Sequence, residues 1–472
     1  MKISSYFIFF CDNIIRGDCM KKYFGDSKFI YSVLVIAIPI MLQNLIQTSV
    51  NLVDSLMVGQ LGDAVIGGVS AVNRYFLILN GGLFGLTGAV AIFIAQFYGA
   101  GNFKKLKESF RFSLISSYVV ILPFFMLAFI FPEAILKFFT NDTAIVMAGV
   151  QYLRVACFTF LPIGLSMMIS GAMRCVGETK IPLAISVISV IINTFLNYCL
   201  IFGNFGMPNL GVSGAAIATL IARIIEVVLL LVALKVLEFP FNTSVFELFN
   251  IDSQLVKQIT LKALPLALNE IFWSFGNATI LKFYGTRGGS VLSGYAICGS
   301  FTDIFYTLFS GMSVATTIMV SQPLGANKLD KAKDNGYQMV GVASLLAFCL
   351  SCLMVSTNFI VPLLYSSASQ EVLYIAKCMI IIQAISFPIY TLNIQSFNVL
   401  RAGGDAKSTL ILDSGFMWGF TIPVLALFGY FTNINIFVLF ALSRGSEIVK
   451  LIVSFALLKK ERWVVNLTHA NS

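Results

Sequence analysis

Long runs of apolar residues recur along the whole chain, and short polar segments separate them. Each run is about 20 residues or longer, the length that an α-helix needs to cross the hydrocarbon core of a bilayer. Six runs fall in each half, with approximate spans 29–53, 70–97, 112–131, 146–170, 182–202, 213–235, 261–283, 293–322, 338–361, 374–398, 409–430 and 435–457. The pattern predicts an all-α polytopic membrane protein with twelve transmembrane helices.

The two halves repeat each other in sequence. The repeated positions are Pro39 and Pro265, Gly59 and Gly285, Gln96 and Gln322, Arg174 and Arg401, Arg223 and Arg444, and Glu226 and Glu447. A polytopic membrane protein built from two such halves commonly moves a substrate through the interface between them. The repeat therefore indicates a transporter as well as an architecture.

Composition and charge agree with this class. The chain has 472 residues, of which 58% are hydrophobic and 11% charged, whereas about a quarter of the residues of a soluble domain are charged. The net charge of +9 comes mostly from short loops on one side of the predicted membrane, such as those at Lys104, Lys180, Lys331 and Lys407. By the positive-inside rule these loops and both termini are cytoplasmic, and a nucleic-acid partner is not needed to explain the charge.

The same pattern predicts the domain boundaries. We expect the true start of the protein at Met20, within a cytoplasmic N-terminal leader. The expected segments are the leader at 1–28, an N-lobe at 29–235, a cytoplasmic linker at 236–260, a C-lobe at 261–458 and a cytoplasmic tail at 459–472.

Several motifs are missing, and their absence narrows the function. The segment GGDAKST at Gly403 lacks the glycine directly before the lysine that a phosphate-binding loop requires, which argues against ATP-driven transport. The sequence has no metalloprotease motif and no nucleophile elbow, so we expect neither an enzyme nor a bound cofactor or metal. A selectivity-filter sequence is absent too. A carrier driven by an ion gradient remains.

Three motifs carry a resemblance to a known family. They are P-x(14)-D-x(4)-G-x-x-G from Pro39 to Gly62, Q-x-x-G-A from Gln96 to Ala100, and R-x-x-G-[ED]-x-K in both halves. In these motifs, and over almost all of residues 29–458, the chain resembles the bacterial MATE (multidrug and toxic compound extrusion) antiporters.

The resemblance implies two six-helix lobes related by a pseudo-twofold axis along the membrane normal. The lobes would alternate between outward- and inward-open states and exchange inward H⁺ or Na⁺ for outward organic cations. A monomer in the cell membrane, with no cofactor beyond the coupling ion, is expected.

The first span carries the leading candidate for ion coupling. Gln43, Gln47, Asn51 and Asp54 follow at steps of four, four and three, so they share one helix face. A polar face on a spanning helix contacts protein or a wet cavity and not lipid. Asp54 also falls where the family places its first-helix carboxylate. The alternative is an Asp at the membrane interface near the helix end.

The fifth span offers a matching polar face, with Ser186, Ser189, Asn193 and Asn197. The proton-coupled archaeal members of the family carry an acid where Asn197 falls. Because this chain has an amide there, Asn193 and Asn197 would ligate a cation or hold Asp54 through hydrogen bonds.

The C-lobe adds three acids inside predicted spans, and such acids are functional candidates by default. They are Glu270, Asp303 and Asp413; polar networks that fix helix contacts are the alternative for each. The tenth-helix Asp of the sodium-coupled branch is replaced here by Tyr390. We expect the substrate cleft to be lined by Gln43, Gln47, Asn51, Trp273, Ser274, Asn277 and Tyr390.

Two charged pairs occupy equivalent places in the halves. Arg223 with Glu226, and Arg444 with Glu447, are each spaced i, i+3, so each pair can close within its own helix. We interpret both as structural.

Two other functions stay open at this point. One is a lipid-linked saccharide flippase of the same wider superfamily, which would have basic residues in its cavity to bind pyrophosphate. The other is a facilitator or channel without ion coupling, which buried carboxylates argue against.

Overall fold

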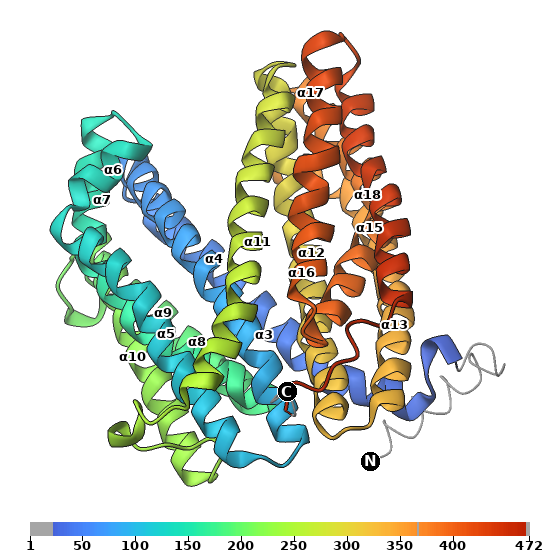
Figure 1. The fold of residues 1–472 in the computed structure, drawn as a ribbon. Coiled ribbons are helices and arrows are strands. Elements are labelled where there is room, and N and C mark those ends of the chain that lie inside the picture. Colours follow the sequence, from blue (N-terminus) through green and yellow to red (C-terminus); the bar gives the residue numbers. More distant parts are fainter. Residues whose placement is uncertain (1–21, 366–367, 469–472) are drawn as a thin grey trace. The chain divides into compact units, whose positions relative to one another are not determined.

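The structure is a computed structural model that describes residues 22–365 and 368–468 (Figure 1). These residues form helices and loops without a β-strand, which confirms the predicted all-α class. The expected start at Met20 and most of the predicted leader lie outside the described residues.

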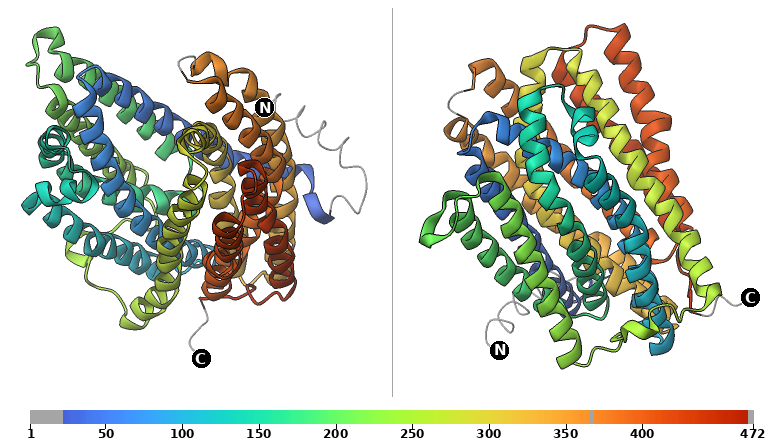
Figure 2. Two further views of the ribbon diagram at one scale, coloured as in Figure 1. Left: turned by 90° about the horizontal axis from the view of Figure 1, so that it is seen from above. Right: turned by 90° about the vertical axis from the view of Figure 1, so that its left-hand side faces the viewer.

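The chain divides into two compact units, and the first, the N-terminal unit, comprises Leu42–Tyr98 and Asn102–Ala263. Its helices are α4 (Asp63–Gly99), α5 (Phe103–Ile130), α6 (Pro132–Phe139), α7 (Thr143–Ala156), η1 (Cys157–Thr159), α8 (Phe160–Cys175), α9 (Lys180–Phe202), η2 (Asn204–Gly206), α10 (Gly211–Val236) and η3 (Val245–Glu247). Within this unit α10 packs against α7, α8 and α9, while α5 packs against α8 (Figure 2).

The C-terminal unit comprises the described residues up to Met41, Gly99–Gly101 and the chain from Leu264 onward. Its helices are α12 (Gly289–Gly325), α13 (Leu329–Ser356), η4 (Thr357–Phe359), α14 (Val361–Leu364), α15 (Gln370–Ala402), α16 (Ala406–Leu410), the π-helical η5 (Ile411–Gly415) and η6 (Met417–Thr421), α17 (Ile422–Phe431) and α18 (Ile436–Lys459). Helix α15 contacts α12, α13 and α18 (Figure 1).

Two long helices are divided between the units. Helix α3 (Ser27–Gly59) changes unit after Met41, and α11 (Ser253–Gly285) changes unit after Ala263. The first part of α3 belongs to the C-terminal core because Ile30, Val33 and Ala37 are buried there. The sequence predicts an N-lobe at 29–235, and residues 29–41 of that range cluster with the C-terminal unit.

Each predicted span falls on a long helix or on a run of consecutive helical segments. In the described part of the chain, ten helices are long and apolar enough to cross a membrane. Two further helices have sufficient length, α11 with 33 residues and α18 with 24. Helix α18 carries Arg444, Glu447 and Lys450 in its middle.

After α10, the last long helix of the N-terminal unit, the chain runs back to contact α5. After α18, the last long helix of the C-terminal unit, it runs back to contact α13. At this return Glu238 and Glu461 both take a φ of 51°, a left-handed conformation that non-glycine residues adopt uncommonly. An aromatic side chain follows each turn and is fully buried, Phe241 in one unit and Trp463 in the other. We call residues 237–252 the linker strap and residues 460–468 the tail strap.

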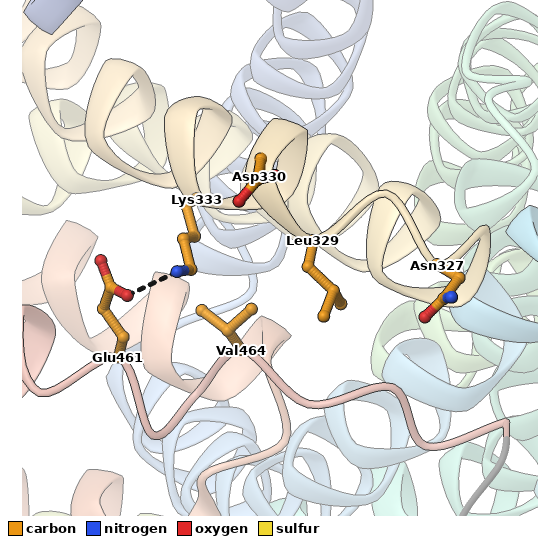
Figure 3. Close-up of a pocket in the computed structure, with 6 residues that line it drawn as sticks. All are labelled: Asn327, Leu329, Asp330, Lys333, Glu461 and Val464. Carbon is orange, nitrogen blue, oxygen red and sulfur yellow. Dashed lines mark ion pairs between the residues drawn. The ribbon is translucent and has the colours of Figure 1, made fainter.

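The tail strap approaches the C-terminal unit closely. A Cβ at Gly403 would lie 1.9 Å from the backbone oxygen of Trp463, so only glycine fits this contact. Lys333 Nζ pairs with Glu461 at 2.7 Å. Figure 3 shows this pair beside a pocket of about 440 Å³ lined by Asn327, Leu329, Asp330, Lys333, Glu461 and Val464. None of the residues predicted to line the substrate cleft is among these lining residues.

The linker strap is held mainly by charge. Arg111 forms an ion pair with Glu247 and also donates to Asn250 O at 3.0 Å. Lys105 pairs with Asp252, and Phe241 packs on Phe110 with ring centroids 4.9 Å apart.

We predict that Asp252→Asn loosens the linker strap at neutral pH. The hydrogen bond from Lys105 lowers the pKa of Asp252 below its ordinary 3.8. A lowered pKa means that the stabilisation is present above 3.8 and is lost as the pH falls through the pKa of the folded protein. Hydrogen exchange of residues 243–252 should therefore be faster in the variant at neutral pH. An unchanged exchange rate at neutral pH would contradict the role of this ion pair.

Candidate functional site

The N-terminal unit joins two of the predicted polar faces at Asp54. Asn197 Nδ2 of α9 donates to Asp54 Oδ1 of α3 at 2.6 Å. When the Asn193 amide is oriented so that both of its ends find partners, it donates to both Asp54 oxygens at 3.2 Å and accepts from Thr219 Oγ1 at 3.3 Å. Both amides are buried and Asp54 is partly buried. Two amide donors thus hold one carboxylate.

Asp54 differs from most other membrane-embedded acids of the chain in its partners. Among the residues that the structure describes, no lysine or arginine forms an ion pair with it. An acid without a fixed basic partner must lower its charge by taking up a proton or another cation when it leaves water. Carboxylate and amide oxygens are also suitable ligands for a hard cation such as Na⁺.

Helix α9 forms the centre of the site because its polar side chains recur on one buried face. Ser186, Ser189, Asn193 and Asn197 are all buried. Ser189 Oγ donates to Ala222 O of α10 at 3.1 Å. The predicted face of the fifth span therefore lies between α3 and α10.

Gln43, a predicted cleft residue, is buried within the N-terminal unit. Its side chain is 4% exposed, donates to Ser186 Oγ at 2.5 Å and accepts from Arg174 Nη2 at 2.7 Å. These bonds use both ends of the amide inside the N-terminal unit, so Gln43 fits a packing role better than a cleft role. Gln47 is partly buried, and Asn51 is exposed.

Glu226 is another acid within a predicted span of the N-terminal unit, and a base is paired with it. Arg223 Nη1 lies 2.7 Å from Glu226 Oε2, as the i, i+3 spacing predicts. Ser166 Oγ donates to Glu226 Oε1 at 2.5 Å, and Ser189 Oγ lies 3.4 Å from Oε2. This carboxylate is neutralised and hydrogen-bonded within the unit.

The predicted pair of Arg444 and Glu447 is not among the ion pairs of the described residues. Glu447 Oε2 instead accepts from Asn393 Nδ2 at 2.7 Å and lies 3.9 Å from Lys450 Nζ. Arg444 lies over the Phe440 ring, 5.1 Å from its centroid. Lys450 is also three residues from Glu447, on its C-terminal side, so the spacing rule alone did not select the partner.

The predicted C-terminal acids have different partners. Glu270 lies 3.9 Å from Arg401, whereas Asp413 lies 2.8 Å from Lys450. Asn269, the neighbour of Glu270, donates to Asp413 Oδ2 at 3.0 Å. Asp303 is exposed on α12.

The predicted cleft residues of α11 are on an exposed part of that helix. Trp273 is 37% exposed, and Ser274 and Asn277 are exposed as well. Ser274 Oγ and Asn277 Nδ2 donate to carbonyls one turn earlier in α11. Tyr390 is partly buried, with its ring centroid 5.0 Å from that of Tyr306.

Sequence reasoning missed several partners of these acids. Arg174 and Arg401 were noticed as repeat positions, but their contacts with Gln43 and Glu270 were not predicted. Lys450 was overlooked, although a lone lysine inside an apolar span is itself a signal of function. Within the described ranges, the acids, histidines and cysteines form no group of three that could hold a metal ion.

Similar proteins place the chain in a family. The profile described as MatE matches residues 39–199 and 265–427. The "Probable multidrug resistance protein YoeA" of Bacillus subtilis is 25% identical over 406 residues, which cover 84% of this chain and 87% of that protein. The "Probable multidrug resistance protein NorM" of Bradyrhizobium diazoefficiens is 25% identical over 408 residues, which cover 85% and 86%.

Solved structures show the same fold. The "Outward-facing conformation of a multidrug resistance MATE family transporter of the MOP superfamily" has a TM-score of 0.81 at 17% identity, covering 91% of this chain and 96% of that one. A variant of the Vibrio cholerae MATE transporter VcmN has a TM-score of 0.80 at 20% identity, covering 93% and 99%. With both sequence repeats matched by the family profile, the chain belongs to the MatE family of membrane transporters.

Proposed function

We propose that this protein is a secondary antiporter that expels organic cationic drugs in exchange for H⁺ or Na⁺. The observation that carries the proposal is Asp54, a partly buried acid that two buried amides hold. Relatives that span most of the chain are named multidrug resistance proteins, which supports drug efflux as the function.

Asp54 would couple the two fluxes through its charge. With its carboxylate ionised, it attracts a cationic drug; once it binds H⁺ or Na⁺, that attraction falls. Asn197 and Asn193 donate to the carboxylate oxygens and so hold it in one orientation. Cation binding from outside and drug binding from inside would then alternate at one carboxylate, with no further cofactor.

Transport by purified protein in liposomes tests this function. An imposed inward gradient of H⁺ or Na⁺ should drive a fluorescent organic cation outward, and collapsing the gradient with an ionophore should stop it. Outward movement that ignores both gradients would overturn the antiport. Transfer of a lipid-linked saccharide between leaflets, without cation exchange, would establish the flippase instead.

We also propose that the protein is a monomer of the cell membrane with both termini in the cytoplasm. The lysine and arginine asymmetry of the loops supports this orientation.

The orientation gives a direct prediction. Single cysteines placed at Asn102, Glu178, Asn327 and Asp405, in a background without other cysteines, should react with an impermeant maleimide only in inverted vesicles. A cysteine at Asp142, in the loop before α7, is the matched control and should react in intact cells. Labelling of the first four sites in intact cells would contradict the proposed topology.

A further inference from the structure

Lys450 is a buried lysine between two acids in the C-terminal unit. It lies on α18 with 8% of its surface exposed. Its Nζ atom is 2.8 Å from Asp413 Oδ1 and 3.9 Å from Glu447 Oε2. Asn269 donates to the other Asp413 oxygen at 3.0 Å, and Asn393 donates to Glu447 Oε2 at 2.7 Å. The ammonium therefore occupies the position between two carboxylates that a small cation would take.

The backbone at Asp413 is unusual as well. Asp413 belongs to the π-helical segment η5, and the π-helical η6 follows it directly after Phe416. Such segments are rare and are frequent at functional sites, because the wider turn redirects side chains. Asn269 Oδ1 accepts from both the backbone N of Ser414 at 3.2 Å and its Oγ at 2.6 Å, which fixes η5 against α11. The helix is thus built to direct Asp413 toward Lys450.

The internal repeat shows which part of this cluster is shared by the two units. In the alignment of Pro39 with Pro265 and of Arg174 with Arg401, the Gln43–Ser186 hydrogen bond corresponds to Asn269–Asp413. With Arg223 aligned to Arg444 as well, the hydrogen bond between Ser166 and Glu226 corresponds to the one between Asn393 and Glu447. The same polar framework is therefore present twice.

Two charges are added to that framework in the C-terminal unit alone. Asp413 stands where the N-terminal unit has Ser186, and Lys450 stands where it has Leu229. The acid and the base occur together, as a matched pair whose charges cancel.

The Asp54 site is, in turn, confined to the N-terminal unit. In the same alignments Asp54 corresponds to Ile280 and Asn197 to Val424. The N-terminal unit thus holds Asp54 with two amides, whereas the C-terminal unit holds Asp413 and Glu447 with both amides and Lys450.

We propose that Lys450 is a built-in cation that fills a cation site of the C-terminal unit permanently. A buried carboxylate needs a positive partner or a proton, because an unpaired charge in a membrane interior is costly. An ammonium on α18 meets that need in every step of the cycle, so Asp413 and Glu447 neither bind nor release the coupling ion. If the proposed antiport is correct, coupling is restricted to the single site at Asp54.

Removing the ammonium should convert this cluster into a site for a diffusible cation. The test uses the full-length protein carrying Asp54→Asn, which removes the proposed coupling site from the background. The thermal unfolding midpoint is measured against Na⁺, with choline at constant ionic strength, at mildly acidic and mildly alkaline pH. Asp413 and Glu447 contact Lys450 directly. Tyr390 interacts electrostatically with both acids and with Arg444, and Glu270 interacts with Asp413.

In the protein that carries both Asp54→Asn and Lys450→Met, the unfolding midpoint should rise saturably with Na⁺ or rise at the acidic pH. The protein with Asp54→Asn alone should show neither response. The matched control adds Asp413→Asn to Lys450→Met and should abolish that response. Lys450→Arg keeps a fixed cation and should remain without it. If Lys450→Met does not accumulate as folded protein, Lys450→Gln is measured in the same way.

Two results would overturn the proposal. One is a Lys450→Met response no larger than that of its background. The other is an unfolding midpoint that already responds to Na⁺ or pH in the Asp54→Asn protein and loses this response when Asp413→Asn is added. Asp413 would then bind an exchangeable cation beside Lys450. Failure of the proposed antiport would be seen separately, as outward movement of the organic cation by the unaltered protein that ignores both the H⁺ and the Na⁺ gradient.

Discussion

Replacement of Asp54 by asparagine is expected to abolish gradient-driven drug exchange while leaving folding and membrane insertion intact. Asparagine has nearly the shape of aspartate and keeps an oxygen that can accept the 2.6 Å hydrogen bond from Asn197 Nδ2. The substitution removes the negative charge and one of the two acceptor oxygens, and the charge is what a proton, Na⁺ or a drug cation would share. Uptake and efflux of an organic cation in proteoliposomes measure the loss directly.

The matched control for this variant is Asp63→Asn. Asp63 is exposed in the first turn of α4, only a few residues after Asp54 in the sequence, so its variant makes the same chemical change outside the site. It should transport at the rate of the unaltered protein. Exchange that persists in Asp54→Asn, with normal expression of both variants, would remove Asp54 from the coupling mechanism.

The sequence predicted the Asp54 site because two separate polar faces pointed to it. Gln43 to Asp54 on the first span, and Ser186 to Asn197 on the fifth, are spaced at one helical period, and the structure joins Asp54 to Asn193 and Asn197. The spacing identifies a face but not the residue opposite. Gln43 for this reason has Arg174 and Ser186 as partners, although it shares the face of Asp54.

The partner of Glu447 in the C-terminal unit is a second case in which spacing does not decide the contact. The i, i+3 rule allowed Glu447 to pair with either Arg444 or Lys450, and contacts from other helices made the choice. Asp413 on η5 binds Lys450, while Arg444 packs over Phe440. A helix-surface pair contributes only about 0.2–0.5 kcal/mol, so a buried interhelical ion pair readily overrides it.

The helices themselves were predictable because a spanning segment must be long, apolar and internally hydrogen-bonded. The straps were not, because they have no periodic pattern. Trp463 is fully buried although it follows Lys459, Lys460 and Arg462, a charged stretch that indicates exposure. Its burial depends on the close approach at Gly403, a tertiary contact that local sequence does not encode.

The drug and the coupling ion are expected to weaken each other's binding. If both draw on the Asp54 carboxylate, two positive charges would share one partly buried negative charge, and the second would be desolvated without compensation. Coupling between linked sites is typically about 1–3 kcal/mol, or roughly 5–150-fold in affinity. The dissociation constant of an organic cation should rise by a factor in this range as the pH falls, if H⁺ is the coupling ion, or as Na⁺ increases, if Na⁺ is.

Thermodynamic linkage also fixes the relation between the drug titration and the cation titration. The drug has to weaken cation binding by the same factor by which the cation weakens drug binding, so both titrations can be made on one detergent-solubilised sample. Asp54→Asn should remove the dependence of drug affinity on pH and Na⁺, whereas Asp63→Asn should preserve it. Drug binding that is insensitive to both ions in the unaltered protein would refute a shared carboxylate. Exchange would then require a conformational switch in which the ion and the drug bind at separate sites, and Asp54 would act on only one of them.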